Sequence, residues 1–279
     1  MAPLTNEVRV RDVVFGAGKP FALIAGPCVI EDEESLLRTA ARLEALTAKL
    51  GVPFVFKSSY DKANRSSASS FRGIGHEEGL RALWKVKREC GCPVISDVHS
   101  IEEVAPASEV LDAIQIPALL SRQTSLIQEA AARGLPINIK KGQFMAPWDV
   151  KNVIEKVREV GNNNVLVTER GTCFGYNNLV TDFRALPAMR EIGYPVVFDA
   201  THSVQLPGGL GNASGGQREF VFPLIRAAVA VGVDGLFLEV HEAPDEAKCD
   251  GPNMLSLDAL HGILEEAKEL DQIAKRREV

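Results

Sequence analysis

The feature that most constrains the fold is a regular alternation of apolar, β-branched segments with amphipathic segments along the 279 residues. Eight segments are typical of buried strands, at 21–29, 53–58, 93–98, 113–118, 136–140, 165–169, 195–200 and 235–240. Helical periodicity separates them at 34–50, 77–89, 122–133, 149–159, 180–191, 218–231 and 256–274, whereas 101–111 is ambiguous. Strands that alternate with helices pair in parallel, so eight such units predict an α/β fold, a closed (β/α)8 or TIM barrel. A doubly wound sheet is the alternative.

The chain is expected to form a single domain over residues 1–279. This length is in the range of one barrel, and 46% hydrophobic residues suffice for a core and a surrounding layer of helices. No linker, charge block or low-complexity segment marks a domain boundary. Residues 7–20 alternate between apolar and polar side chains and then turn, which predicts an N-terminal β-hairpin that closes the amino-terminal end of the barrel.

Composition excludes several classes of function. The formal net charge of −6 argues against a nucleic-acid partner, because binding to a phosphate backbone requires a basic face. No apolar run reaches the ~18 residues needed to span a membrane, and the amino terminus lacks a signal-peptide pattern. The five cysteines are odd in number and scattered, which argues against a disulfide framework and indicates a reducing compartment. We therefore expect a cytoplasmic protein that does not contact membranes.

The segment 57–72 has the composition of a phosphate-binding loop. It follows an apolar run and combines four cationic side chains with seven hydroxyl side chains and an amide. Lysine supplies a mobile point charge, arginine a planar fork that matches phosphate oxygens, and serine and asparagine supply short hydrogen-bonding groups. The alternative is a solvated polar loop without a ligand.

Every predicted strand ends near a polar or ionisable residue. These residues are Cys28, Lys57, Asp97 with His99, Gln115, Lys140, Arg170, His202, and Glu239 with His241. The interior of a barrel is normally aliphatic, and barrel enzymes carry their catalytic groups at the carboxyl ends of the strands. The pattern therefore predicts an active site at this rim.

Charge divides the predicted rim into two sets. A cationic set large enough for two phosphorylated substrates comprises Lys57, Lys62, Arg65, Lys140 and Arg170, with Arg122 as an extension. A second set, expected opposite the first, offers four metal ligands from neighbouring strands, namely Cys28, His202, Glu239 and Asp250. Thiolate, imidazole and carboxylate donors suit Zn²⁺, Fe²⁺ or Mn²⁺. The alternatives are that Cys28 is a small buried side chain and that His202 is a hydrogen-bonded core residue.

Ten short stretches occur in a fixed order along the chain. They are AGPC (25–28), FKSSYDKANRSS (56–67), SDVH (96–99), IQIPA (114–118), NIKKGQF (138–144), ERG (169–171), FGYNNL (174–179), FDATHS (198–203), ASGGQR (213–218) and KCDGP (248–252). Together they resemble the 3-deoxy-D-manno-octulosonate 8-phosphate synthase family over nearly the whole chain. The segment KANRSS (62–67) is specific to this family within a superfamily that also includes heptulosonate-phosphate and sialic acid synthases.

The resemblance implies a transferase that condenses phosphoenolpyruvate with D-arabinose 5-phosphate and water in Kdo and lipopolysaccharide biosynthesis. It also implies a homotetramer without an organic cofactor. The residues that match the family's phosphoenolpyruvate site are Lys57, Ser59, Lys62, Lys140 and Arg170. Those that match the pentose-phosphate site are Asn64, Arg65 and Ser66, with Arg122 reaching it across a subunit interface, and those at the reacting centre are Asp97, Gln115 and His202. The alternatives are a related synthase of the heptulosonate-phosphate or sialic acid type, and a sugar-phosphate-binding protein without catalysis.

The implied reaction leaves the identity of the general base open. Carbon 3 of the enol attacks the aldehyde, water adds at carbon 2, and phosphate leaves by carbon–oxygen cleavage. The candidate catalytic residues are His202, Asp250, Lys57 and Asp97. Either Asp250 or a metal-bound water could act as the base, and His202 could assist proton transfer.

Two features of the matching segments concern the metal and access to the site. Cys28 resembles the metal-binding members of the family, whereas CDGP (249–252) resembles the metal-independent members. We expect a divalent metal, Zn²⁺, Fe²⁺ or Mn²⁺, at this site. The Gly-rich segment 207–217 lacks the ending of a nucleotide P-loop and is expected to be either a mobile flap over the site or an ordinary loop.

Overall fold

The computed structural model describes residues 4–65, 67, 69–209 and 214–276. Within this part of the chain, eight parallel strands form a closed barrel, because the last strand pairs with both the first and the seventh. The barrel strands are β3 (Ala22–Gly26), β4 (Phe54–Lys57), β5 (Val94–Asp97), β6 (Ala113–Ile116), β7 (Ile137–Lys140), β8 (Val165–Glu169), β11 (Val196–Asp199) and β14 (Gly235–His241). The predicted barrel and its eight strands are confirmed, and the doubly wound alternative is wrong.

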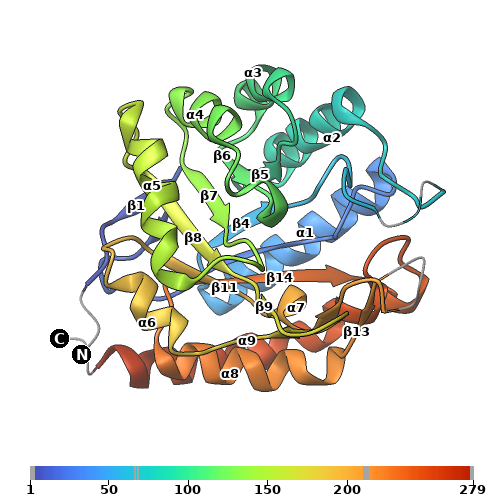
Figure 1. Ribbon diagram of the computed structural model, residues 1–279. Coiled ribbons are helices and arrows are strands. Elements are labelled where there is room, and N and C mark those ends of the chain that lie inside the picture. The colour runs from blue at the N-terminus through green and yellow to red at the C-terminus, as the bar shows by residue number, and fades with distance from the viewer. Residues whose placement is uncertain (1–3, 66, 68, 210–213, 277–279) are drawn as a thin grey trace.

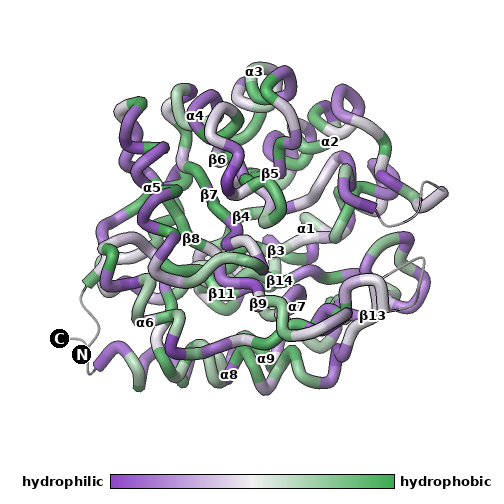
Figure 2. Tube along the Cα trace, in the orientation of Figure 1, coloured by the Kyte–Doolittle hydropathy of each residue, from purple (hydrophilic) through white to green (hydrophobic). Residues whose placement is uncertain are grey.

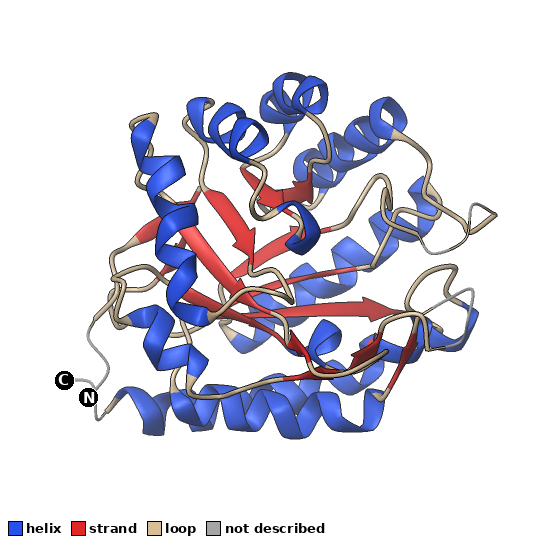
Figure 3. Ribbon diagram, in the orientation of Figure 1, coloured by secondary structure: helices blue, strands red, loops and turns tan. Residues whose placement is uncertain are grey.

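Helices surround the strands on the outside of the barrel, as Figures 1 and 3 show. They are α1 (Glu33–Leu50), α2 (His76–Glu89), α3 (Ile101–Val110), α4 (Thr124–Ala132), α5 (Val150–Glu159), α6 (Ala185–Arg190), α8 (Val221–Val231) and α9 (Leu260–Lys275). The segment that was ambiguous in sequence is α3, whose helical pattern is interrupted by Pro106. In the described part of the chain, no helix combines the length and the apolar character required to cross a bilayer.

Period-2 alternation along each strand builds two apolar layers. In β3, Leu23 and Ala25 face the helices, whereas Ala22 and Ile24 face the barrel interior. Because both faces of each barrel strand are covered, the strands read as continuous apolar runs. The outer helices instead alternate between hydrophobic and hydrophilic residues, as α5 and α9 do in Figure 2.

The N-terminal hairpin closes the amino-terminal end of the barrel, as predicted. Strands β1 (Val8–Val10) and β2 (Val13–Phe15) pair antiparallel. Their apolar side chains belong to the same buried cluster as Ile24, Val55 and Phe237 of the barrel interior. The hairpin therefore shields this end of the barrel from solvent, and the open mouth lies at the carboxyl ends of the strands.

Local signals fix the ends of some helices. Helix α1 begins after Asp32, whose carboxylate accepts a hydrogen bond from the amide of Ser35, and ends at Gly51 with φ of 63°. An acidic N-cap satisfies a free amide of the first turn, and glycine adopts the left-handed conformation without a steric penalty. The observed start of α1 lies one residue before the predicted start, and its end is as predicted.

The helix predicted at 180–191 is shorter in the structure. Strand β10 (Leu179–Val180) pairs with β9 (Thr172–Cys173) in a small antiparallel hairpin, and α6 begins only at Ala185. The backbone of residues 179–180 is satisfied across this hairpin, which the periodicity of the sequence does not reveal. The remaining short elements are α7 (Ala200–Ser203), β12 (Gln205–Leu206), β13 (Gly215–Gly216), β15 (Leu255–Ser256) and the 3-10 helices η1 (Ala118–Leu120), η2 (Pro147–Asp149), η3 (Arg218–Phe220), η4 (Pro244–Glu246), η5 (Gly251–Asn253) and η6 (Leu257–Ala259).

Candidate active site

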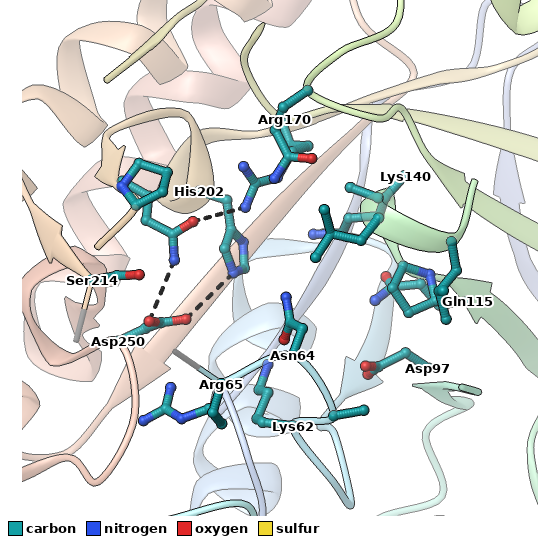
Figure 4. Close-up of a pocket in the computed structure, with 18 of the residues that line it drawn as sticks. Lys62, Asn64, Arg65, Asp97, Gln115, Lys140, Arg170, His202, Ser214 and Asp250 are labelled. Atoms are coloured by element: carbon teal, nitrogen blue, oxygen red, sulfur yellow. Dashed lines mark hydrogen bonds and ion pairs between the residues drawn. The ribbon is translucent and has the colours of Figure 1, made fainter. Parts of the chain in front are cut away.

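A cavity of about 560 Å³ lies at the carboxyl end of the barrel strands. The predicted residues that line it are Lys57, Lys62, Asn64, Arg65, Asp97, His99, Gln115, Lys140, Arg170, His202, Glu239 and Asp250. Figure 4 shows Lys140 and Arg170 on one side of the site, with Lys62, Asn64 and Arg65 below them in the view. These predicted rim residues therefore line one cavity, which is large enough for small phosphorylated molecules.

Other predicted residues lie outside the cavity wall. Ser59 and Cys28 are buried directly behind it, and Arg122 is exposed to solvent without lining this chain's own cavity. His241 does not line the cavity, and its Nε2 atom lies 3.7 Å from Oε1 of Glu31. Ser66 lies outside the described residues.

Two buried cations follow strands β7 and β8. Lys140 contacts the carboxylate of Asp199 and lies 3.3 Å from the centre of the Phe237 ring. Burial and the neighbouring Lys57 lower the pKa of Lys140 to about 8, although Asp199 opposes this shift. Arg170 donates from Nη2 to Gln205, whereas its buried Nη1 has no hydrogen-bond partner among the described residues. An unsatisfied buried guanidinium donor is costly unless a ligand accepts from it.

A hydrogen-bonded chain joins Lys57 to the next strand. Lys57 Nζ donates to Ser59 Oγ at 2.8 Å, and Ser59 Oγ donates to Asp97 Oδ1 at 2.5 Å. Burial alone would raise the pKa of Asp97, but Lys57 and a hydrogen bond from His99 hold it well below its usual value. Asp97 is therefore an ionised carboxylate at the wall of the cavity.

The two sets of charge are not separated across the rim, which corrects the prediction. Lys57 Nζ lies 3.5 Å and Lys62 Nζ 3.7 Å from Oε1 of Glu239. Burial alone would raise the pKa of Glu239, but His202, Lys62 and Lys57 lower it to about 2. Burying so many like charges without counter-ions would be unfavourable, so the lysines and the candidate metal ligands share one network.

Asp199 is a functional residue that the sequence analysis did not single out. It ends β11 and caps α7, accepting a hydrogen bond from the backbone amide of His202 at 2.9 Å. Its other carboxylate oxygen lies 2.7 Å from Nδ1 of His202. Burial alone would raise its pKa, but His202 and Lys140 hold the pKa of Asp199 far below its usual value. The sequence contains a signal for this role, because Asp199 stands three positions before His202 at the end of a predicted strand, the spacing of a helix N-cap.

The four predicted metal ligands fall into two groups that share Asp250, one with His202 and Glu239 and the other with Cys28. His202 Nε2 lies 3.5 Å from Glu239 Oε2 and 3.9 Å from Asp250 Oδ2, and Asp250 Oδ2 lies 3.5 Å from Cys28 Sγ. Ligand atoms about 2.0–2.3 Å from one tetrahedral ion would lie roughly 3.3–3.8 Å apart. Glu239 Oε2 is buried and accepts no hydrogen bond from the described residues, whereas Oε1 faces the lysines. The carboxylate oxygen Oε2 faces Nε2 of His202.

Cys249 adds a second thiol that was not predicted as a site residue. Its Sγ lies 3.1 Å from Cys28 Sγ and accepts a hydrogen bond from Arg65 Nη1 at 2.9 Å. With Cys28 and Asp250 it forms a second group of potential ligands. Burial raises the pKa of the Cys28 thiol, as does the hydrogen bond with Cys249. A metal ligand must be a thiolate, so binding of an ion here would release a proton.

The Gly-rich segment follows β11 and α7 along the chain and contributes residues to the cavity. Strands β12 and β13 pair antiparallel, and Pro207, Gly208 and Ser214 between them line the cavity. Residues 210–213 of this predicted flap lie outside the described residues. At the base of the segment, Gln205 accepts from Arg170 and donates to Asp250. Gln205 therefore connects the Gly-rich segment to a cationic residue and to a candidate metal ligand of the site.

Comparisons with known proteins identify the family to which the sequence is similar. The DAHP synthetase I family matches residues 2–276 of the chain. The chain is 60% identical over 272 residues to the 2-dehydro-3-deoxyphosphooctonate aldolase of Geobacter metallireducens, and 59% identical over 272 residues to that of Geobacter sulfurreducens. It is 58% identical over 273 residues to the protein of the same name from a further Geobacter strain. Each match covers 98% of this chain and 100% of the relative.

Proposed function

The chain belongs to the DAHP synthetase I family, and we propose that its barrel mouth joins phosphoenolpyruvate, D-arabinose 5-phosphate and water. The products are 3-deoxy-D-manno-octulosonate 8-phosphate and inorganic phosphate. The enzyme is a transferase of Kdo and lipopolysaccharide biosynthesis, in agreement with the name of its relatives. The observation that carries the proposal is the convergence of five cationic side chains on one cavity, namely Lys57, Lys62, Arg65, Lys140 and Arg170.

The arrangement of the cations supports two anion sites. Lys140 and Arg170 approach from β7 and β8 and suit the phosphate and carboxylate of phosphoenolpyruvate, because Arg170 Nη1 is free to donate. Asn64 and Arg65 follow β4 and suit the phosphate of the pentose. Fixing both substrates in one cavity lowers the entropic part of the barrier to carbon–carbon bond formation. The alternative that the chain is a synthase of the heptulosonate-phosphate or sialic acid type is not favoured by the names of the relatives.

During the reaction, charge develops on the substrates at positions where side chains of the cavity can stabilise it. Carbon 3 of phosphoenolpyruvate forms a bond to the aldehyde carbon, whose oxygen gains negative charge and then a proton. Positive charge at carbon 2 attracts water, and the bond from carbon 2 to the phosphate oxygen breaks. Lys57 and Asp97 lie at the cavity wall as donor and ionised carboxylate, and Asp250 is the candidate acceptor for the proton of the water.

We propose that a divalent transition metal binds Cys28, His202, Glu239 and Asp250. An imidazole and two carboxylates, from His202, Glu239 and Asp250, lie within 4.8 Å of one another, and Asp250 lies equally close to the thiol of Cys28. Glu239 Oε2 is buried without a hydrogen bond from the described residues. Such a set favours Zn²⁺, Fe²⁺ or Mn²⁺. The ion would supply a Lewis acid beside the reacting carbons. In its presence His202 remains oriented through Asp199, and Lys57 and Lys62 balance the remaining charge of Glu239.

We further propose a cytoplasmic homotetramer. All five cysteines are free, which suits a reducing compartment. Arg122 is exposed away from this chain's cavity, and Phe144, Trp148, Phe174 and Tyr176 are more than half exposed. Aromatic residues are enriched at protein–protein interfaces. Light scattering coupled to size-exclusion chromatography would give four times the 30.2 kDa of one chain.

The function is tested by incubating the purified protein with both substrates and measuring product mass and phosphate release. Erythrose 4-phosphate and N-acetylmannosamine in place of arabinose 5-phosphate separate the related synthases. With oxygen-18 at the bridging oxygen of phosphoenolpyruvate, the label is expected in inorganic phosphate, because water attacks carbon 2. Label retained in the sugar would contradict the mechanism, and absence of turnover with arabinose 5-phosphate would contradict the assignment.

A further inference from the structure

Glu103 of helix α3 lies behind the cavity and links two of its loops. Its Oε2 atom accepts a hydrogen bond from the hydroxyl of Tyr60 at 2.6 Å and from the backbone amide of His99 at 2.9 Å. The same oxygen lies 3.3 Å from Nδ1 of His99. Tyr60 belongs to the segment that follows β4, whereas His99 follows β5. Glu103 itself does not line the cavity.

The contacts of His99 define its protonation. Nδ1 faces Glu103, and Nε2 lies 3.0 Å from Oδ2 of Asp97. An ionised carboxylate can only accept, so a ring with a carboxylate at each nitrogen is fully satisfied only when both nitrogens carry protons. Burial lowers the pKa of His99, but the hydrogen bonds to Asp97 and Glu103 outweigh burial and raise it to about 9. The rings of His99 and Tyr60 pack edge to face, as do the rings of Tyr60 and His76.

The charges then alternate from the cavity wall outward. Lys57 Nζ lies 3.7 Å from Asp97 Oδ1, which also accepts from Ser59, and Asp97 Oδ2 faces His99. We propose that Glu103 is a positioning residue that holds His99 as an imidazolium and thereby fixes the carboxylate of Asp97 and the ammonium of Lys57 at the reacting centre. This inference rests on the proposed function, because Asp97 and Lys57 are placed there by that proposal. Glu103 acts through His99 and touches neither substrate.

The test uses the substitution Glu103→Gln, which keeps the size of the side chain and an acceptor for Tyr60 but removes the negative charge. In wild-type protein, NMR of carbon-13-labelled histidine should show His99 titrating above pH 8, with the signal assigned from His99→Gln. In Glu103→Gln the pKa of His99 should fall by at least about one unit. The matched control is Glu102→Gln, which removes the same charge from the adjacent exposed position of α3 and should leave this pKa unchanged.

Kinetics separate a positioning role from a structural one. In Glu103→Gln, kcat at pH 8 should fall at least about twofold, because a one-unit fall in the pKa leaves about half of His99 protonated, while the KM for phosphoenolpyruvate changes little. Because the imidazolium is present only below its pKa, the loss should be partly reversed at pH 6. If His99 titrates at or below pH 6.5 in the wild type, the proposal is overturned whether or not the variant folds. An unchanged kcat in a Glu103→Gln variant in which the pKa of His99 has fallen would also overturn it. Wild-type protein that fails to turn over the two substrates would instead contradict the proposed function, since the titration uses no substrate.

Discussion

Nδ1 of His202 lies 2.7 Å from Oδ2 of Asp199, and the backbone amide of His202 donates to the other oxygen of the same carboxylate. One carboxylate therefore fixes both the backbone and the ring of the histidine. The contact at Nδ1 leaves Nε2 facing Glu239 and Asp250. A histidine that donates one ring nitrogen to a carboxylate and presents the other is typical of metal ligands in proteins.

The substitution Asp199→Asn should weaken metal binding without removing a ligand. The amide keeps the shape of the side chain but loses the charge that orients His202 and neutralises Lys140. Metal affinity should fall about 10- to 100-fold, as measured by competition with a chromogenic chelator. Unchanged affinity would show that the orientation of His202 does not depend on this carboxylate.

Removal of the metal should abolish activity in the wild type, and Zn²⁺, Mn²⁺ or Fe²⁺ should restore it. Cys28→Ala should lose both bound metal and turnover, because the softest ligand is gone. Cys28→Asn should keep substantial activity that resists a chelator, since asparagine matches the metal-independent members that CDGP (249–252) resembles. Cys92→Ala is the matched control, because Cys92 is buried away from the cavity. A wild-type protein without metal by elemental analysis and with a chelator-resistant rate would make Cys28 a packing residue.

The kcat/KM for phosphoenolpyruvate should decrease as pH rises through about 8. Burial first, and then Lys57, lower the pKa of Lys140 to this value, and a lysine is charged only below its pKa. The free enzyme therefore loses one of the cations that bind the anionic substrate on the alkaline side. A pH profile of kcat/KM checks this expectation. If the same alkaline limb persists in Lys140→Ala, another group is responsible.

The substitution Arg170→Ala should lower kcat/KM for phosphoenolpyruvate about 100-fold, equivalent to ~2.7 kcal/mol. The guanidinium is buried with a free donor, so its loss removes a charge-assisted hydrogen bond to the substrate. Unfolding temperature should change little, because residues at this end of a barrel support function more than packing. Arg158→Ala, at an exposed position of α5, is the control and should have wild-type kinetics. Equal effects of the two substitutions would remove Arg170 from the site.

The substitution Phe15→Ala should lower stability without affecting catalysis. Phe15 is fully buried in the cluster that closes the amino-terminal end of the barrel, opposite the cavity. Deleting a buried phenylalanine ring lowers the free energy of unfolding by about 3–5 kcal/mol. Denaturant titration measures this loss, with Phe220→Ala, 47% exposed, as the control. A large fall in kcat of the folded variant would mean that the hairpin also shapes the active site.

The sequence alone determined which segments form the barrel and many of the residues that line its mouth. Period-2 and 3.6-residue patterns are local properties of the chain, and they identified all eight strands. The carboxyl ends of parallel strands share one edge, so residues such as Lys140 and Arg170 could be assigned to one site without knowing their contacts. The predicted helix 180–191 was wrong over 180–184, because Val180 belongs to β10, which pairs with β9. Ser256, the first residue of the predicted helix 256–274, belongs to β15.

The tertiary structure decided which of these side chains contact one another. Glu239 lies between Lys57 and His202, and Cys249 lies against Cys28 although 221 residues separate them. Glu103 contacts His99 from helix α3 without lining the cavity itself. These contacts depend on the register in which the barrel closes and on the rotamers that its packed interior allows, and neither is encoded in the pattern of a single segment. The charge of each residue was therefore predictable, whereas its partner, and hence its pKa and role, depended on the folded barrel.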